Sequence, residues 1–143
     1  MDNGLSAAQT KGTALIDPRF VVQRNFPRCD DYDENSFNGQ LHEHARWAQD
    51  EYWLLEWALY QLATEEEVDP ELYWQVFRIF SHCFLSLGCH FDRNDSYKIR
   101  NLKRAQLYDC RERLQVVFEG FFSRNMPEQT IFEEENPLLL TAH

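Results

Sequence analysis

The sequence predicts an all-α protein, a compact bundle of three long helices with an additional N-terminal packing segment. Apolar residues recur at helical spacing along three long segments. The chain has only five Gly and five Pro residues, which argues against an all-β or loop-rich fold. Its 143 residues, of which 43% are hydrophobic, suffice for one core. We therefore expect a disordered tail over residues 1–13, a single helical domain over 14–125, and a partly docked acidic C-terminal tail over 126–143.

The N-terminal packing segment is expected in "ALIDPRFVVQRNF", residues 14–26. Its apolar and β-branched residues are interrupted by Pro18, so the segment is either extended chain or a short helix packed on the core. Residues 27–39, "PRCDDYDENSFNG", have the composition of a linker.

The first long helix has the clearest periodicity in the chain. Seven apolar residues follow one another at spacings of four or three, which is one face of an α-helix held for six turns. They are Leu41, Ala45, Ala48, Tyr52, Leu55, Leu59 and Leu62.

The second long helix is expected from Pro70 to about His90. Asp69 suits the N-cap position and Pro70 the first helical position. The interior has no carboxylate and a single cation, Arg78, so this helix is predicted to be the central and most buried element. Its polar residues define one narrow strip that faces water or a partner: Gln75, Arg78, His82 and Ser86.

A third helix is expected to begin at Asp95 or Ser96 and to end near Ser123. Its outer face is basic and carries Lys98, Arg100, Lys103, Arg104, Arg111 and Arg113. The tail that follows is expected to dock through Ile131, Phe132 and Leu138 to Leu140.

The stretch "HCFLSLGCH", residues 82–90, contains two His and two Cys that invite a metal-site hypothesis. On an intact helix Cys83 and Cys89 point about 120° apart, and the pairs that share a face are about 10 Å apart. One zinc ion needs ligands within about 2.0 to 2.3 Å. We therefore expect core thiols and no metal or other cofactor. The alternative is that Gly88 unwinds the helix end and brings Cys89 and His90 towards Cys29 or Cys110.

The sequence contains no motif that indicates an enzyme. It has no nucleophile elbow and no Gly-rich phosphate loop. In "HEHARW", His42 and His44 are two residues apart, whereas a zinc protease helix needs four. We expect a protein without catalytic activity; an active site assembled from scattered residues is the alternative.

Charge and hydropathy restrict the location and the partners. The formal net charge of −10 argues against direct nucleic-acid binding and favours a basic protein partner. No run approaches 18 apolar residues, and "MDNGLSAAQTKGT" lacks the features of a signal peptide. A cytoplasmic protein is expected, with no membrane contact and with its four Cys reduced. The sequence does not indicate an oligomeric state.

Carboxylates gather in three segments, 30–34 ("DDYDE"), 65–71 ("EEEVDPE") and 133–135 ("EEE"). They are either solvated loops that balance the basic helix or a binding surface for a basic protein, with Tyr32 as an aromatic anchor. The predicted partner-binding residues are Asp30, Asp31, Tyr32, Asp33, Glu34, Glu65, Glu66 and Glu67.

A small, acidic, aromatic-rich chain with "DDYDE" and "EEE" resembles the immunity proteins of bacterial contact-dependent growth inhibition and colicin-type toxin systems. This resemblance implies a cognate toxin, often a basic nuclease, that the protein binds and neutralises. Such proteins share no single fold, so the resemblance assigns no residue a role. The alternative is a helical adaptor or regulatory subunit that docks a partner helix through an exposed Trp47, Trp53 or Trp57.

Overall fold

A computed structural model describes residues 16–67 and 69–140. The tail predicted over residues 1–13 lies outside this part of the chain. The described residues form α-helices and one short 3-10 helix with no strand, which confirms the all-α prediction. The elements are α2 (Pro18–Asn25), α3 (Phe37–His44), α4 (Gln49–Leu62), α5 (Pro70–Phe91), α6 (Arg104–Ser123) and η1 (Gln129–Ile131).

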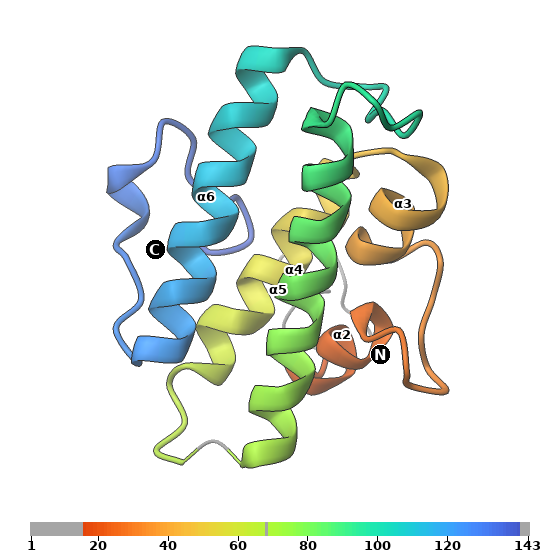
Figure 1. The fold of residues 1–143 in the computed structure, drawn as a ribbon. Coiled ribbons are helices and arrows are strands. Elements are labelled where there is room, and N and C mark those ends of the chain that lie inside the picture. Colours follow the sequence, from red (N-terminus) through yellow and green to blue (C-terminus); the bar gives the residue numbers. More distant parts are fainter. Residues whose placement is uncertain (1–15, 68, 141–143) are drawn as a thin grey trace, which may run out of the picture.

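The helices pack around α4 and α5 (Figure 1). Helix α2 packs on α4 and α5, α3 packs on α5 and α4, and α6 packs on both long neighbours. The segment after α6 returns along the outer side of that helix (Figure 1). Two short helices therefore accompany three longer ones, in place of a bundle of three long helices.

The N-terminal packing segment was expected as either extended chain or a short helix, and its described part contains a short helix, α2. The side chain of Asp17 accepts a hydrogen bond from the backbone N–H of Arg19 at 3.0 Å. Pro18 occupies the start of the helix, where the missing N–H costs nothing. Val21 and Val22 are fully buried, so the helix is held by packing.

The predicted first long helix is wrong as one element, because residues 45–48 separate α3 from α4. Ala45 has φ 51° and ψ 43°, a left-handed conformation that ends α3. The backbone of the buried Trp47 is then held by Asn101, whose Oδ1 accepts the Trp47 N–H at 2.9 Å and whose Nδ2 donates to the Trp47 C=O at 2.8 Å. The periodicity survives the break because both helices turn their apolar faces to the same core.

The predicted start of the third helix at Asp95 or Ser96 is also wrong, because α6 begins at Arg104. Asp95 accepts the N–H of Tyr97, two residues on, in a local turn instead of capping a helix. The loop then braces the α3–α4 junction, since the backbone N–H of Arg100 donates to the C=O of Ala45 at 3.0 Å.

Helix α5 has the predicted start, because Asp69 accepts the N–H of Leu72 at 2.8 Å. We expected α5 to be the most buried helix, but one of its faces is open to solvent, since Trp74, Phe77 and Leu85 are exposed. The polar strip predicted to face water or a partner is at least partly buried, with His82 and Ser86 buried and Gln75 and Arg78 half-buried. In that strip His82 contacts Asn38, with 3.1 Å between Nδ1 and Oδ1.

The segment after α6 packs on the bundle through three of the five predicted side chains, Phe132, Leu138 and Leu139, and through Asn136, which the sequence did not indicate. Asn136 is fully buried, and Phe132 and Leu138 are partly buried. Ile131 and Leu140, two of the predicted contacts, are exposed.

Candidate partner-binding surface

Helix α2 holds two of the acidic segments, which are far apart in the sequence. Arg19 forms ion pairs with Glu65 at 3.0 Å and with Asp69 at 3.1 Å. Arg24 forms one with Asp33 at 3.0 Å. The two arginines are five residues apart, roughly 8 Å along the helix axis. Both acidic segments therefore lie in the half of the molecule where α5 begins (Figure 1).

Among the described residues, three of the eight predicted partner-binding residues make polar contacts through their side-chain carboxylates. Asp33 accepts the backbone N–H of Asn35 at 2.8 Å, and this bond and Arg24 hold its pKa below the usual value. Glu34 lies 3.1 Å from the ring of His44, and Glu65 pairs with Arg19. These carboxylates shape the loops.

Gly39 fixes the first acidic loop against α3. A Cβ at this position would lie 2.5 Å from the carbonyl oxygen of Asp33 and 2.6 Å from the Cα of Glu34. Ser36 caps α3 from the same loop, because its Oγ accepts the N–H of Gly39 at 3.1 Å. Residues 33–36 are thus pressed onto the helix, and the loop has a defined shape.

Four predicted residues, Asp30, Asp31, Glu66 and Glu67, have exposed side chains. None of them has an ion-pair partner among the residues that the structure describes. Tyr32 is half-buried, and burial raises the pKa of its hydroxyl, with a further contribution from Glu43. The four free carboxylates are the part of the predicted surface that can meet a partner.

An exposed apolar stripe on α5 lies beside these acids and was missed by the sequence reasoning. Trp74 is 42% exposed, Phe77 50% and Leu85 58%. With two small residues they follow one line at spacings of three and four, which is one face of the helix. The apolar stripe is Trp74, Phe77, Ser81, Leu85 and Gly88.

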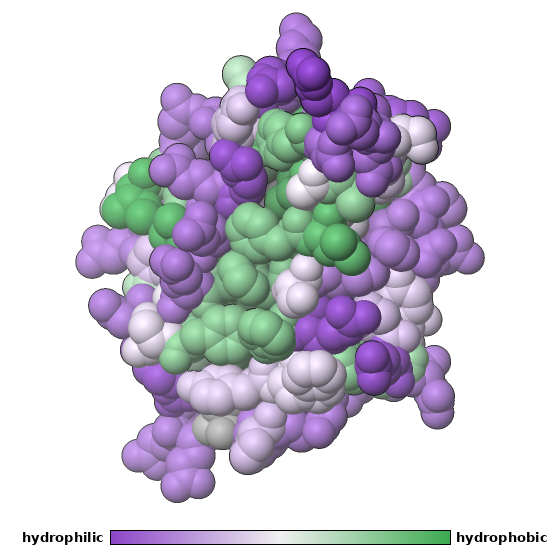
Figure 2. Space-filling view, viewed as in Figure 1, coloured by the Kyte–Doolittle hydropathy of each residue, from purple (hydrophilic) through white to green (hydrophobic). Residues whose placement is uncertain are grey.

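Figure 2 shows this face, where a hydrophobic band over α5 and its seam with α6 is bordered by hydrophilic residues. Aromatic side chains line the seam: the ring of the partly buried Phe80 stacks on the buried Phe118 at 5.2 Å, and Tyr73 meets Phe122 at 5.9 Å. The interior of this helix, after Leu72, has no carboxylate, and an apolar interior of this kind predicts burial as readily as an exposed stripe.

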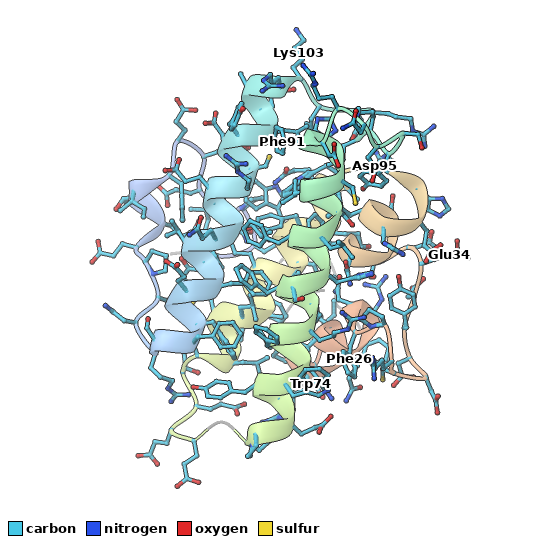
Figure 3. The ribbon with its side chains drawn as sticks, viewed as in Figure 1. Phe26, Glu34, Trp74, Phe91, Asp95 and Lys103 are labelled. Carbon is cyan, nitrogen blue, oxygen red and sulfur yellow. The ribbon has the colours of Figure 1, made fainter. Side chains whose placement is uncertain are left out.

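The stripe begins at the acidic end of the molecule. Trp74 lies near the start of α5 (Figure 3), three residues after the exposed Glu71. Its ring meets that of Phe26, the residue after α2, edge-on at 6.4 Å. An exposed indole one helical turn from an exposed carboxylate has the composition of an interface anchor.

The other end of α5 is basic. The rings of Phe91 and Tyr108 stack at 5.2 Å, and the guanidinium groups of Arg104 and Arg111 lie 4.9 to 5.7 Å from their centres. Within the described residues, none of the cations at this end has an ion-pair partner. They are Arg93, Lys98, Arg100, Lys103, Arg104 and Arg111.

The tryptophans proposed to dock a partner helix are not available for that role. Trp47, Trp53 and Trp57 are buried, so this version of the adaptor hypothesis is wrong. Arg113 covers one face of Trp53, with 4.7 Å from its guanidinium carbon to the ring centre.

The thiols and histidines of "HCFLSLGCH" remain on an intact helix, because α5 continues through Gly88 to Phe91. Cys83 is fully buried and burial raises its pKa, so the thiol is protonated. His90 faces the following loop, where its Nδ1 accepts the N–H of Ile99 at 2.9 Å. In the described part of the chain, no three His, Cys, Asp or Glu side chains are placed to hold a metal ion.

An open cavity of about 430 Å³ lies between α6 and the segment that follows it. Cys110 lines it, and burial raises the pKa of this thiol to about 11. Arg113 lines it too, but its guanidinium is already paired with the carboxylate of Glu56. A protonated thiol and a paired arginine do not form a nucleophile with a base.

Within the described residues, no helix combines the length and the apolar character needed to cross a bilayer. Comparison of the chain with protein-family models, with curated proteins and with solved structures found no match.

Proposed function

We propose that this protein is an immunity protein that binds and neutralises a cognate bacterial toxin with a basic surface, such as a nuclease. It acts in the cytosol by binding alone, without a cofactor or a catalytic step. The observation that carries the proposal is that four free carboxylates, Asp30, Asp31, Glu66 and Glu67, stand on two loops that α2 holds in the same half of the molecule.

Free carboxylates are suited to steer a basic partner. A charged group that is already paired within the chain adds little to the electrostatic field that an approaching partner meets, whereas unpaired groups of one sign raise the rate of encounter. The internal pairs of Asp33 and Glu65 hold the loops in place, so the free carboxylates are presented without a large ordering cost.

Trp74 is the anchor that we assign to this surface. It is 42% exposed, lies one turn from Glu71, and is supported from behind by Phe26. Burial of a large aromatic side chain at the centre of a charged rim is the usual origin of interface affinity.

The test uses the toxin encoded beside the gene of this protein. The variant Asp30→Asn/Asp31→Asn/Glu66→Gln/Glu67→Gln should bind at least about tenfold more slowly, and the association of the wild type should slow as salt rises. Stopped-flow measurement at low and high ionic strength gives both rates, and growth of cells that express the toxin reports neutralisation.

A matched control removes four exposed carboxylates elsewhere, as Asp109→Asn/Glu119→Gln/Glu128→Gln/Glu135→Gln. It has the same net charge as the test variant and should keep most of the association rate. An equal loss in both variants, or association that is indifferent to salt, would contradict steering by this surface.

A helical adaptor or regulatory subunit that docks a partner helix is the second candidate. The exposed apolar stripe of α5 supports it, in place of the three buried tryptophans. The two functions separate in the carboxylate variant above, because docking of an apolar helix would survive the loss of the charges.

A further inference from the structure

We propose that the apolar stripe of α5 binds the same stripe of a second copy of this chain, with the two helices antiparallel and the two-fold axis at Ser81. The stripe holds three of the seven large apolar side chains that are exposed in the described residues, Trp74, Phe77 and Leu85. An isologous dimer covers them in one contact, because each residue of the stripe meets the stripe of the other copy.

The sizes of the side chains match under this symmetry. A two-fold axis at Ser81 sets Trp74 against Gly88 of the other copy, since both are seven residues from the axis, and sets Phe77 against Leu85, four residues away. A Cβ placed on Gly88 would meet nothing within 4 Å, so the space over this glycine is open. The largest side chain of the stripe thus faces its smallest residue, as knobs face holes between packed helices.

The charges match as well. Exposed carboxylates stand at the start of α5 and just before it, Glu71, Glu66 and Glu67, while exposed cations stand beyond its other end, among them Arg93 and Arg104. In an antiparallel pair the acidic end of one copy lies over the basic end of the other, and the helix dipoles oppose each other favourably. A parallel pair would set like charges together in a chain whose net charge is already −10.

The surroundings of the stripe suit a close approach. The seam beside it is lined by partly buried aromatic side chains of α5 and α6, including Tyr73 and Phe80. Ser81 at the axis and Gly88 near the end are small, so two helices can pack at an interaxial distance of about 8 to 10 Å. The Cα atoms of the two Ser81 residues would then be about 3.5 to 5.5 Å apart.

One consequence rests on the proposed function. Trp74 belongs both to the dimer contact and to the surface assigned to the toxin, so the two partners exclude each other. The dimer itself is independent of that assignment and is tested on the protein alone.

Cross-linking at the axis tests the geometry. Under mild oxidation, Ser81→Cys should give a disulfide-linked band of twice the 17.1 kDa chain mass, because the expected Cα separation suits a disulfide. The wild type shows what the four native thiols contribute, and Glu119→Cys places a new exposed thiol on α6 away from the stripe. Cross-linking of Ser81→Cys no greater than that of Glu119→Cys would overturn the proposal.

The variant Gly88→Gln is expected to weaken dimerisation without destabilising the fold. An exposed helical glycine costs stability, so the variant should melt at a higher temperature than the wild type, while the new side chain fills the space for Trp74. Analytical ultracentrifugation should show dimers for the wild type and at least tenfold weaker dimerisation for Gly88→Gln and Trp74→Ala. A wild type that stays monomeric up to about 100 µM, or a Gly88→Gln variant that dimerises unchanged, would overturn the proposal. Neither result would bear on toxin binding.

Discussion

Glu56 and Arg113 form a bidentate ion pair inside the protein, with both N–O distances at 2.8 Å and Glu56 fully buried. The hydroxyl of Tyr52 donates to the same carboxylate at 2.8 Å. Gln129 and Asn136, from the segment after α6, donate to it at 3.0 and 3.1 Å. One carboxylate therefore joins α4, α6 and the C-terminal segment.

Arg113→Met should destabilise the protein by about 3 to 5 kcal/mol, because Glu56 would remain buried without a counter-charge. Urea unfolding at neutral pH measures the free energy of unfolding. Arg93→Gln is the matched control, because Arg93 is exposed and has no ion-pair partner within residues 16–67 and 69–140, and it should change stability by less than about 0.5 kcal/mol. A loss below about 1 kcal/mol for Arg113→Met would show that Glu56 is solvated after all.

Asn136→Ala should release the segment over residues 126–140. The amide of Asn136 donates to the C=O of Trp53 at 2.9 Å and to Glu56, and both acceptors are buried. Their loss should cost about 1 to 3 kcal/mol, and limited proteolysis should cut the segment faster than in the wild type. The exposed neighbour serves as the control, since Glu135→Ala should leave the digestion rate unchanged.

Acidification should weaken the contact between α3 and α5. Burial, followed by the nearby His42 and Arg78, lowers the pKa of His82 from 6.5 to about 4. The amide of Asn38 donates to the C=O of Asn25, so its Oδ1 faces His82 and accepts the proton on Nδ1. The folded state thus holds a neutral ring.

The sign follows from this pKa. Below pH 6.5 the His82 ring takes up a proton in the unfolded chain but not in the folded chain. The contribution of the neutral ring to the free energy of unfolding is therefore complete above pH 6.5. It is lost as the pH falls towards 4, by about 3 kcal/mol. Urea unfolding at pH 7 and pH 5 should show a smaller loss for His82→Gln than for the wild type. His90 acts in the same direction, because burial lowers its pKa too, and the double variant His82→Gln/His90→Gln should lose less still. Equal slopes for the wild type and His82→Gln would refute this account.

Two glycines should respond in opposite ways to alanine. Gly39→Ala forces the backbone at Asp33 and Glu34 away from α3 and should cost about 1 to 3 kcal/mol. Gly88→Ala adds a Cβ in open space within a helix and should gain about 0.5 to 1 kcal/mol. Thermal unfolding of the pair measures both, and similar losses in the two variants would contradict the close contact at Gly39.

The sequence predicted those helix ends that depend on residues only a few positions away. Asp69 and Pro70 predicted the start of α5, because a cap and a first-turn proline act within a few residues. The break at Ala45 was not predictable in this way. It depends on Asn101, 54 residues after Trp47, which replaces the hydrogen bonds that the helix would have made.

The candidate surface was predicted in part. The carboxylates of residues 30–34 and 65–67 were chosen from their charge, but only their contacts with Arg19 and Arg24 distinguish those that shape the loops from those that are free. The stripe around Trp74 was missed, since an apolar helix face looks the same in a sequence whether a neighbour covers it or water does.

The two hydrogen bonds between the Asn101 side chain and the Trp47 backbone also set an order of events during folding. Until the chain has passed through α5 and turned back, no partner exists for the Trp47 backbone, and residues 37–62 carry the periodicity of one uninterrupted helix. The bend between α3 and α4 is therefore acquired late, from a contact that closes a long loop. Slow closure of that loop would delay the docking of α3, and with it the seating of the first acidic loop against Gly39.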